Sequence, residues 1–189
     1  MYFGKKDAQQ LILIKKLVEY MKYPICVVPC DTVREHHGLA MSSRNEYLNT
    51  SDRGRAKIIY LSLLEAKKML DKGETQYNII KNKIESILRI EPDINIDYIS
   101  IANSETLDEY DEIIRGKILI SVAVFFCGVR LIDNIFYYSH VGDTRIYSIK
   151  EIFFSRDKFK IAQLTEDDNL IGNPYVLRAL SHLVPEPSP

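Results

Sequence analysis

Residues 2–28 read YFGKKDAQQLILIKKLVEYMKYPICVV, and this stretch decides the fold class. Between residues 7 and 21 the apolar positions recur at helical spacing, with lysines and a glutamate on the other side. Pro24 ends this helix. Short apolar segments at residues 2–4 and 25–28 lie before and after it and are predicted to be buried strands. The order strand–helix–strand predicts a fragment of an α/β unit.

The segment from residue 41 to about residue 134 predicts a small α+β domain of two helices and a sheet. Hydroxyl side chains that can cap helices precede two amphipathic runs, and Gly73 follows the first of them. A roughly alternating run and an almost continuously apolar run come next, with an acidic turn between them. The expected elements are helices from Thr50 or Ser51 to Asp71 and from Thr75 onward, and strands over residues 96–102 and 117–126.

The composition excludes several functional classes. The chain has 189 residues, a formal net charge of −1 and interspersed charges, which do not indicate a nucleic-acid or membrane partner. The longest apolar run, residues 118–127, is too short to cross a bilayer, and the charged N-terminus does not resemble a signal peptide. Cys26, Cys30 and Cys127 are interpreted as buried small hydrophobic residues in a reducing compartment, not as metal ligands. We therefore expect a cytoplasmic protein without a metal site.

The turn Gly4-Lys5-Lys6-Asp7 is a candidate anion site. Because a glycine lies between strand and helix, backbone N–H groups can approach an anion at the helix N-terminus. Lys6 would then reach a phosphate, while Asp7 would accept a ribose hydroxyl or cap the helix. One of the next glutamines, Gln9 or Gln10, would point to the strand ends, where α/β folds bind ligands. The alternative is a solvated turn followed by solvent-facing glutamines.

The loop Met41-Ser42-Ser43-Arg44 is a second candidate. Two hydroxyls and a guanidinium offer several hydrogen-bond donors without a competing negative charge, which suits a triphosphate or a departing pyrophosphate. The alternative is a serine-rich loop that caps a helix.

Taken together, these motifs resemble the pantothenate synthetase family. The resemblance rests on four segments in the order and spacing of that family, and the third is the most specific. The segments are Phe3-Gly4-x-Lys6-Asp7-x-Gln9-Gln10-Leu11, Val33-Arg34-Glu35, Gly38-Leu39-Ala40-Met41-Ser42-Ser43-Arg44-Asn45-x-Tyr47-Leu48 and Arg130-Leu131-Ile132-Asp133-Asn134.

The resemblance implies a fold and a reaction. Residues 1–40 would be the end of a Rossmann-like nucleotidyltransferase domain, and residues 41–136 a C-terminal α+β lid domain. The family uses ATP, accompanied by Mg²⁺, to convert pantoate to pantoyl adenylate and then joins it to β-alanine. Its intact members are typically homodimers.

The resemblance also implies roles for individual residues. Lys6, Ser42, Ser43 and Arg44 would be the catalytic residues, because they would neutralise phosphate charge. Gln10 would bind pantoate, and the backbone of Val33 would meet the adenine. The residues implied to bind ATP are Gly4, Lys5, Lys6, Asp7, Val33, Met41, Ser42, Ser43 and Arg44.

The sequence departs from the family pattern in a few positions and in one large respect. Lys5 stands where the family usually has Glu, Ala8 replaces an aromatic residue, and His37 replaces an Asp; we interpret His36 and His37 as a solvated loop pair. The N-terminal half of the family, with its two-histidine motif, has no counterpart in this chain. We therefore expect little or no activity from the chain alone. The alternative is a non-catalytic remnant that needs a separate N-terminal half or only binds nucleotide weakly.

Residues 137–189 have no place in the synthetase pattern. The segments 138–147 and 163–168, and more faintly 173–180, resemble part of the type-2C metal-dependent Ser/Thr phosphatases. In that family these segments are scaffold strands. A phosphatase-related protein is thus a third hypothesis, with the tail otherwise an added or disordered segment.

Overall fold

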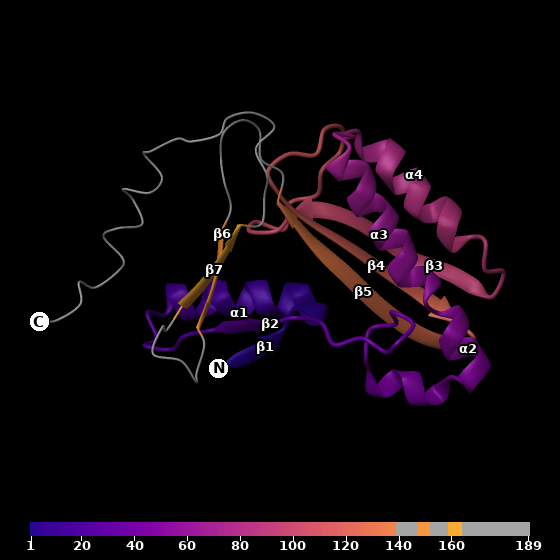
Figure 1. Ribbon diagram of the computed structural model, residues 1–189, viewed down its shortest axis with the longest axis horizontal. Coiled ribbons are helices and arrows are strands. Elements are labelled where there is room, and N and C mark those ends of the chain that lie inside the picture. Colours follow the sequence, from indigo (N-terminus) through magenta and orange to yellow (C-terminus); the bar gives the residue numbers. More distant parts are fainter. Residues whose placement is uncertain (139–146, 152–158, 164–189) are drawn as a thin grey trace, which may run out of the picture. The chain divides into compact units, whose positions relative to one another are not determined.

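The computed structural model describes residues 1–138, 147–151 and 159–163, the last two ranges as backbone only (Figure 1). Its contacts divide the chain into two compact units, residues 1–139 and 140–189. In the second unit, β6 (Tyr147–Glu151) pairs antiparallel with β7 (Phe159–Gln163). Most of the segment that resembles the phosphatases lies outside the described residues. The boundary predicted at residue 40 lies inside the first unit.

The N-terminal segment forms the predicted strand–helix–strand unit. β1 (Tyr2–Gly4) leads through a 3-10 turn, η1 (Lys5–Asp7), into α1 (Ala8–Tyr20). β2 (Val28–Cys30) then pairs parallel with β1, with Tyr2 opposite Val28. The α/β prediction is confirmed, although β2 begins three residues later than expected. The prediction that the two strands are buried was wrong, because neither contains a buried residue.

The second part of the first unit contains three helices and a three-stranded antiparallel sheet in the order β3-β4-β5. The helices are α2 (Thr50–Arg55), α3 (Ile58–Asp71) and α4 (Tyr77–Leu88). The strands are β3 (Ile94–Asn103), β4 (Lys117–Phe126) and β5 (Val129–Tyr138). The predicted α+β character and both predicted strands are confirmed.

The prediction of one long helix up to Asp71 was wrong, because the helix is broken between α2 and α3. Its cap was also misplaced: the side chain of Asn49 accepts a hydrogen bond from the Asp52 N–H at 2.8 Å. The helix that Thr75 was expected to cap begins at Tyr77, so its N-cap is Gln76 instead. The carbonyl of Thr75 accepts the Ile114 N–H at 2.8 Å, so this residue belongs to a connection with the following loop.

The third strand, β5, was not predicted. It follows β4 through a two-residue turn, with Phe126 opposite Val129. Both turn residues have positive φ, 48° at Cys127 and 77° at Gly128. Such a pair is typical of a type I′ turn, which matches the twist of a β-hairpin.

The sheet is covered on both faces along β4, which explains its almost continuous apolar sequence. On one face, alternate residues of β4 pack with α3 and α4, which lie side by side along the sheet (Figure 1). On the other face, Leu119 packs with Ala8 and Ile12 of α1. The first turns of α1 are therefore held against the sheet.

The prediction that the three cysteines are buried was wrong, since Cys26, Cys30 and Cys127 are all exposed. Cys30 ends a strand whose described neighbour is β1 alone, and Cys127 lies in the hairpin turn. Within the described ranges, no three His, Cys, Asp or Glu side chains are close enough to hold a metal ion. No described helix is long and apolar enough to cross a membrane.

Candidate functional site

The two lysines of the first candidate turn have different environments. The Lys5 Nζ donates to Asp31 Oδ1 at 2.5 Å, which directs this side chain toward the end of β2. Lys6 lines two neighbouring cavities and, within residues 1–138, forms no ion pair. A methyl group added at Gly4 would meet no atom within 4 Å, so there is room beside the backbone for a ligand. Lys6 is the lysine placed to attract an anion.

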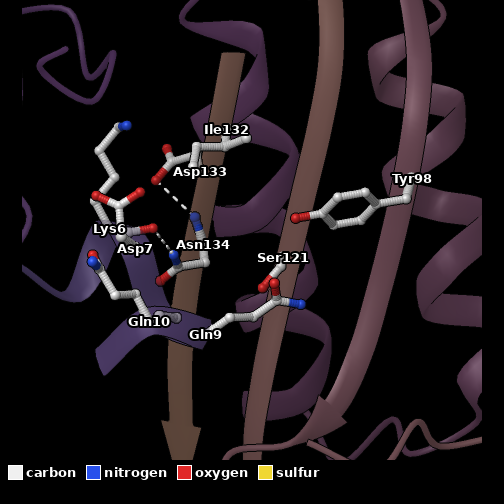
Figure 2. A pocket seen from close by; sticks show the side chains of 10 residues that line it. Lys6, Asp7, Gln9, Gln10, Tyr98, Ser121, Ile132, Asp133 and Asn134 are labelled. Atoms are coloured by element: carbon white, nitrogen blue, oxygen red, sulfur yellow. Dashed lines mark hydrogen bonds between the residues drawn. The ribbon is translucent and has the colours of Figure 1, made fainter. Parts of the chain in front are cut away.

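A cavity of about 200 Å³ lies between the start of α1 and the sheet (Figure 2). Both Gln9 and Gln10 line it, but they point to different sides: Gln10 lies near Asp7, and Gln9 lies toward Ser121 (Figure 2). Asp7 is exposed and its side chain makes no cap hydrogen bond to α1. Burial raises the pKa of the Tyr98 phenol above its ordinary value. The lining residues are Lys6, Asp7, Ala8, Gln9, Gln10, Tyr98, Ser121, Ile132, Asp133 and Asn134.

Residues 33–41 fold into a tight hairpin that brings two predicted site segments together. The Met41 N–H donates to the Val33 carbonyl at 2.9 Å, and Arg34 pairs antiparallel with Ala40. The turn needs a glycine at position 38, where φ is 104° and a Cβ would lie 2.9 Å from the Tyr60 ring. The residue expected to meet adenine and the first residue of the serine loop are therefore direct neighbours.

The side chain of a buried asparagine, Asn45, hydrogen-bonds the loop after this hairpin to the hairpin itself. The Asn45 Nδ2 donates to Glu35 Oε1 at 2.8 Å and to the Ala40 carbonyl at 3.1 Å. The Ser42 hydroxyl accepts the Arg44 N–H at 3.3 Å and caps a short 3-10 helix, η2 (Ser43–Tyr47). Asn45 thus ties the loop to the hairpin.

The structure brings Lys6, Ser42 and Arg44 to one narrow cleft of about 10 Å³. Met41 and Ser43 are exposed beside it and do not line it. The Arg44 guanidinium forms no ion pair within residues 1–138 and is free to meet an anion.

Arg130, which the sequence interpretation did not select, lines the same cleft. Its Nη2 donates to Asp97 Oδ2 at 2.7 Å, which fixes the guanidinium at the start of β5. The signal was present, because Arg130 is the first residue of the fourth family segment. Lys6, Arg44 and Arg130 therefore line one cleft. Lys6 and Arg44, which form no ion pair within residues 1–138, make it attractive to a phosphate group.

Sequence interpretation also missed Arg34, Asp133 and Asn134. The Arg34 guanidinium donates twice to Asp133, with Nη1 2.6 Å from Oδ2 and Nη2 2.9 Å from Oδ1. The Asn134 Nδ2 donates to the Lys6 carbonyl at 2.6 Å (Figure 2). The sequence signal for Asp133 was a carboxylate in the middle of a largely apolar stretch.

The prediction that His36 and His37 are a solvated pair was wrong for His37. Its side chain is 14% exposed, and Nε2 lies 3.1 Å from Glu35 Oε2. Glu35 also accepts a hydrogen bond from the Asn45 amide. His37 is therefore linked through Glu35 to the asparagine that holds the Met41–Arg44 loop. His36 is exposed.

Comparison with known proteins gives a consistent match over the same part of the chain. The family model described as pantoate-beta-alanine ligase matches residues 1–136. The pantothenate synthetase of Clostridium botulinum (strain Loch Maree / Type A3) is 50% identical over 133 residues, which are 70% of this chain and 47% of that protein. The pantothenate synthetase of Acetivibrio thermocellus is 44% identical over 134 residues, 71% of this chain and 47% of that protein.

A solved structure agrees with these matches. The pantothenate synthetase of Thermus thermophilus has 37% sequence identity and a TM-score of 0.65, covering 71% of this chain and 48% of that one. The chain spans about half the length of the curated relatives it matches.

Proposed function

Because the chain belongs to the pantoate–β-alanine ligase family, we propose that it supplies one side of the active site of an ATP-dependent ligase. The ligase condenses pantoate with β-alanine to pantothenate through a pantoyl-adenylate intermediate. One observation carries the proposal: Lys6, Ser42 and Arg44 line one cleft, directly beside the hairpin that joins Val33 to Met41. This arrangement suits a nucleotide that is held at its base and at its phosphates together.

The reaction has two steps. A pantoate carboxylate oxygen attacks the α-phosphorus of ATP, and the bond to the leaving pyrophosphate breaks. The neutral amine of β-alanine then attacks the pantoyl carbonyl, AMP leaves, and the amine loses a proton. Both steps require stabilisation of phosphate charge more than a strong base, and cations with fixed hydrogen-bond donors provide it.

In this proposal the cleft residues neutralise that charge. Lys6 and Arg44 bind the phosphates, and the Ser42 hydroxyl in the cleft and the Ser43 hydroxyl beside it donate to phosphate oxygens. Arg130, which is paired with Asp97, contributes less charge. Each charge-assisted hydrogen bond contributes about 1.5–3 kcal/mol.

The remaining assignments concern the substrates. Gly4 and Asp7 approach the ribose and phosphates, Val33 meets the adenine through its backbone, and Gln10 binds pantoate. Gln10 is supported by its place in the larger cavity, next to Asp7 and Lys6 (Figure 2). Lys5, which is paired with Asp31, has a smaller role than the resemblance implies.

We infer that Mg²⁺ enters with the nucleotide. Mg²⁺ typically keeps several waters and binds through substrate phosphates with one or two carboxylates. The described residues offer one carboxylate for that mode, because Asp7 lies beside Lys6 at the cavity. The ion would offset phosphate charge there.

The alternative is a non-catalytic remnant that needs a separate N-terminal half or only binds nucleotide weakly. Exposed apolar side chains on α1 favour a partner surface: Leu13, Leu17 and Tyr20 are 58%, 49% and 83% exposed.

In the intact ligase we also expect a homodimer. The phosphatase-like reading of the tail stays a prediction.

Product formation separates these possibilities. AMP and pantothenate are measured from ATP, pantoate and β-alanine with this chain alone, and then with an added N-terminal half from a relative. We expect products only in the mixture. Products from the chain alone would show that it is active by itself, and no products in either, with a folded chain, would overturn the ligase proposal.

A further inference from the structure

Two adjacent residues of β5 hold the two phosphate-binding segments from opposite sides of the strand. Successive side chains of a strand point to opposite faces of the sheet. Asp133 meets Arg34 of the 33–41 hairpin, while Asn134 donates to the carbonyl of Lys6. The two segments are far from β5 in sequence, by 99 residues for Arg34 and 128 for Lys6.

Arg34 fixes the hairpin at several points at once. Besides its two bonds to Asp133, Nη1 donates to the Gly38 carbonyl at 3.1 Å. Its guanidinium lies 3.6 Å from the centroid of the Tyr60 ring, which adds a cation–π contact with α3. One side chain thus joins the hairpin turn, a strand and a helix.

The Arg34–Asp133 pair is buried and therefore sensitive to the loss of either partner. The side chains are 18% and 3% exposed. If one partner of such a pair is removed, an uncompensated charge is left away from water, whereas removal of both charges is often tolerated.

Asp133 also orients its neighbour. Its Oδ1 accepts the Asn134 N–H at 2.8 Å, so the carboxylate satisfies an amide of this edge strand. The Arg34 pair and the Lys6 bond therefore share one dipeptide. A shift of Asp133 would move both attachments.

We propose that Arg34, Asp133 and Asn134 are positioning residues that set the separation between Lys6 and the Met41–Arg44 loop. They act through the two segments they hold and do not touch the nucleotide. The inference deepens the proposed function and rests on it for the identity of the ligand. Its structural part, that β5 holds both segments, stands on the contacts alone.

The test uses the full chain and single variants that keep side-chain shape. Asp133→Asn and Arg34→Gln each leave one charge buried, and the double variant removes both. Arg89→Gln and Glu85→Gln are matched controls, because these two residues form an exposed ion pair at the end of α4. Hydrogen exchange is measured at the hairpin amides of Glu35, Gly38 and Met41 and, separately, at amides of α3 and β4. Mg·ATP binding is titrated for each variant.

In each single variant we expect the hairpin amides to exchange at least about tenfold faster while the α3 and β4 amides are unchanged, because local opening is separable from global unfolding. Mg·ATP affinity should fall at least about tenfold, and the losses of the double variant should be smaller than the sum of the single losses, because both substitutions break the same contact. The controls should match the wild type.

Unchanged hairpin exchange in both single variants would overturn the proposal. So would equal acceleration at hairpin and core amides, because it indicates a role in overall stability only. A double variant whose losses equal the sum of the single losses would also overturn it, because the two side chains would then act independently. If the wild-type chain shows no Mg·ATP binding, the exchange data still decide whether β5 holds the hairpin, and the nucleotide-binding part of the proposed function fails instead.

Discussion

The two halves of the described site are stabilised in different ways. The small domain around β4 has a closed apolar core, with Leu63, Ile80 and Ile84 fully buried. The β1–α1–β2 unit buries little of its own apolar surface, and most of α1 beyond Ile12 is exposed or half-exposed. Lys6 lies in the β1–α1–β2 segment, and its position depends on contacts with the sheet. The comparison indicates that the core sets stability, while a few polar contacts set the geometry of the site.

Truncation of an apolar side chain in each half is the strongest test of this comparison. Ile84→Ala should lower the free energy of unfolding by about 2–5 kcal/mol, because it removes contacts in the closed core and leaves a cavity. Leu17→Ala, at a half-exposed position of α1, should change it by less than about 0.5 kcal/mol. Denaturant unfolding measures both, and equal losses would refute the asymmetry.

Removal of cleft cations should affect binding and leave stability nearly unchanged. Lys6→Ala and Arg44→Ala should each weaken Mg·ATP binding by about one to two powers of ten, as expected for a lost charge-assisted hydrogen bond. Lys5→Ala is the matched control and should have a smaller effect, because Lys5 is engaged by Asp31. Isothermal titration distinguishes the lysines, and identical losses at both would contradict the assignment of Lys6.

Gly38→Ala should disturb the hairpin that connects the halves of the nucleotide site. A side chain there is forced into a left-handed conformation and against the Tyr60 ring, at a cost of about 1–3 kcal/mol. Gly54→Ala, in α2 with open space around it, should be neutral or slightly stabilising. Thermal unfolding of the two variants measures the difference; a Gly38→Ala protein as stable as the wild type would show that the turn is not constrained.

The smallest expected effect concerns the β4–β5 turn. Cys127→Asn should raise the free energy of unfolding by about 0.5 kcal/mol, because Asn-Gly is the preferred type I′ pair and Cys127 adopts a positive φ. Denaturant unfolding under reducing conditions measures it. A loss of stability would mean that the hydrogen bond between the thiol and Asp52 outweighs the turn preference.

Sequence reasoning predicted the features that local patterns encode. The apolar spacing of α1, the continuous run of β4 and the family segments are readable from neighbouring residues. The Asn49 cap and the Cys127-Gly128 turn were readable too and were overlooked. Both follow known residue preferences.

Other features depend on residues far apart in the chain. Asp133 is unusual in an apolar strand, but its partner Arg34 lies 99 residues away. The burial of His37 likewise follows from how the hairpin turn packs and not from its neighbours in sequence. The exposure of the cysteines depends on which surfaces the described elements cover, which composition does not reveal.

The central claim is that the Lys6 turn, Val33 and the Met41–Arg44 loop form one nucleotide site. Its most direct test is a titration of the isotopically labelled chain with Mg·ATP, followed by backbone amide NMR signals. The account predicts that the amides of Lys6, Val33 and Met41 shift together, with one dissociation constant, while those of α4 stay in place. Shifts confined to one of these segments, or different dissociation constants for them, would contradict it.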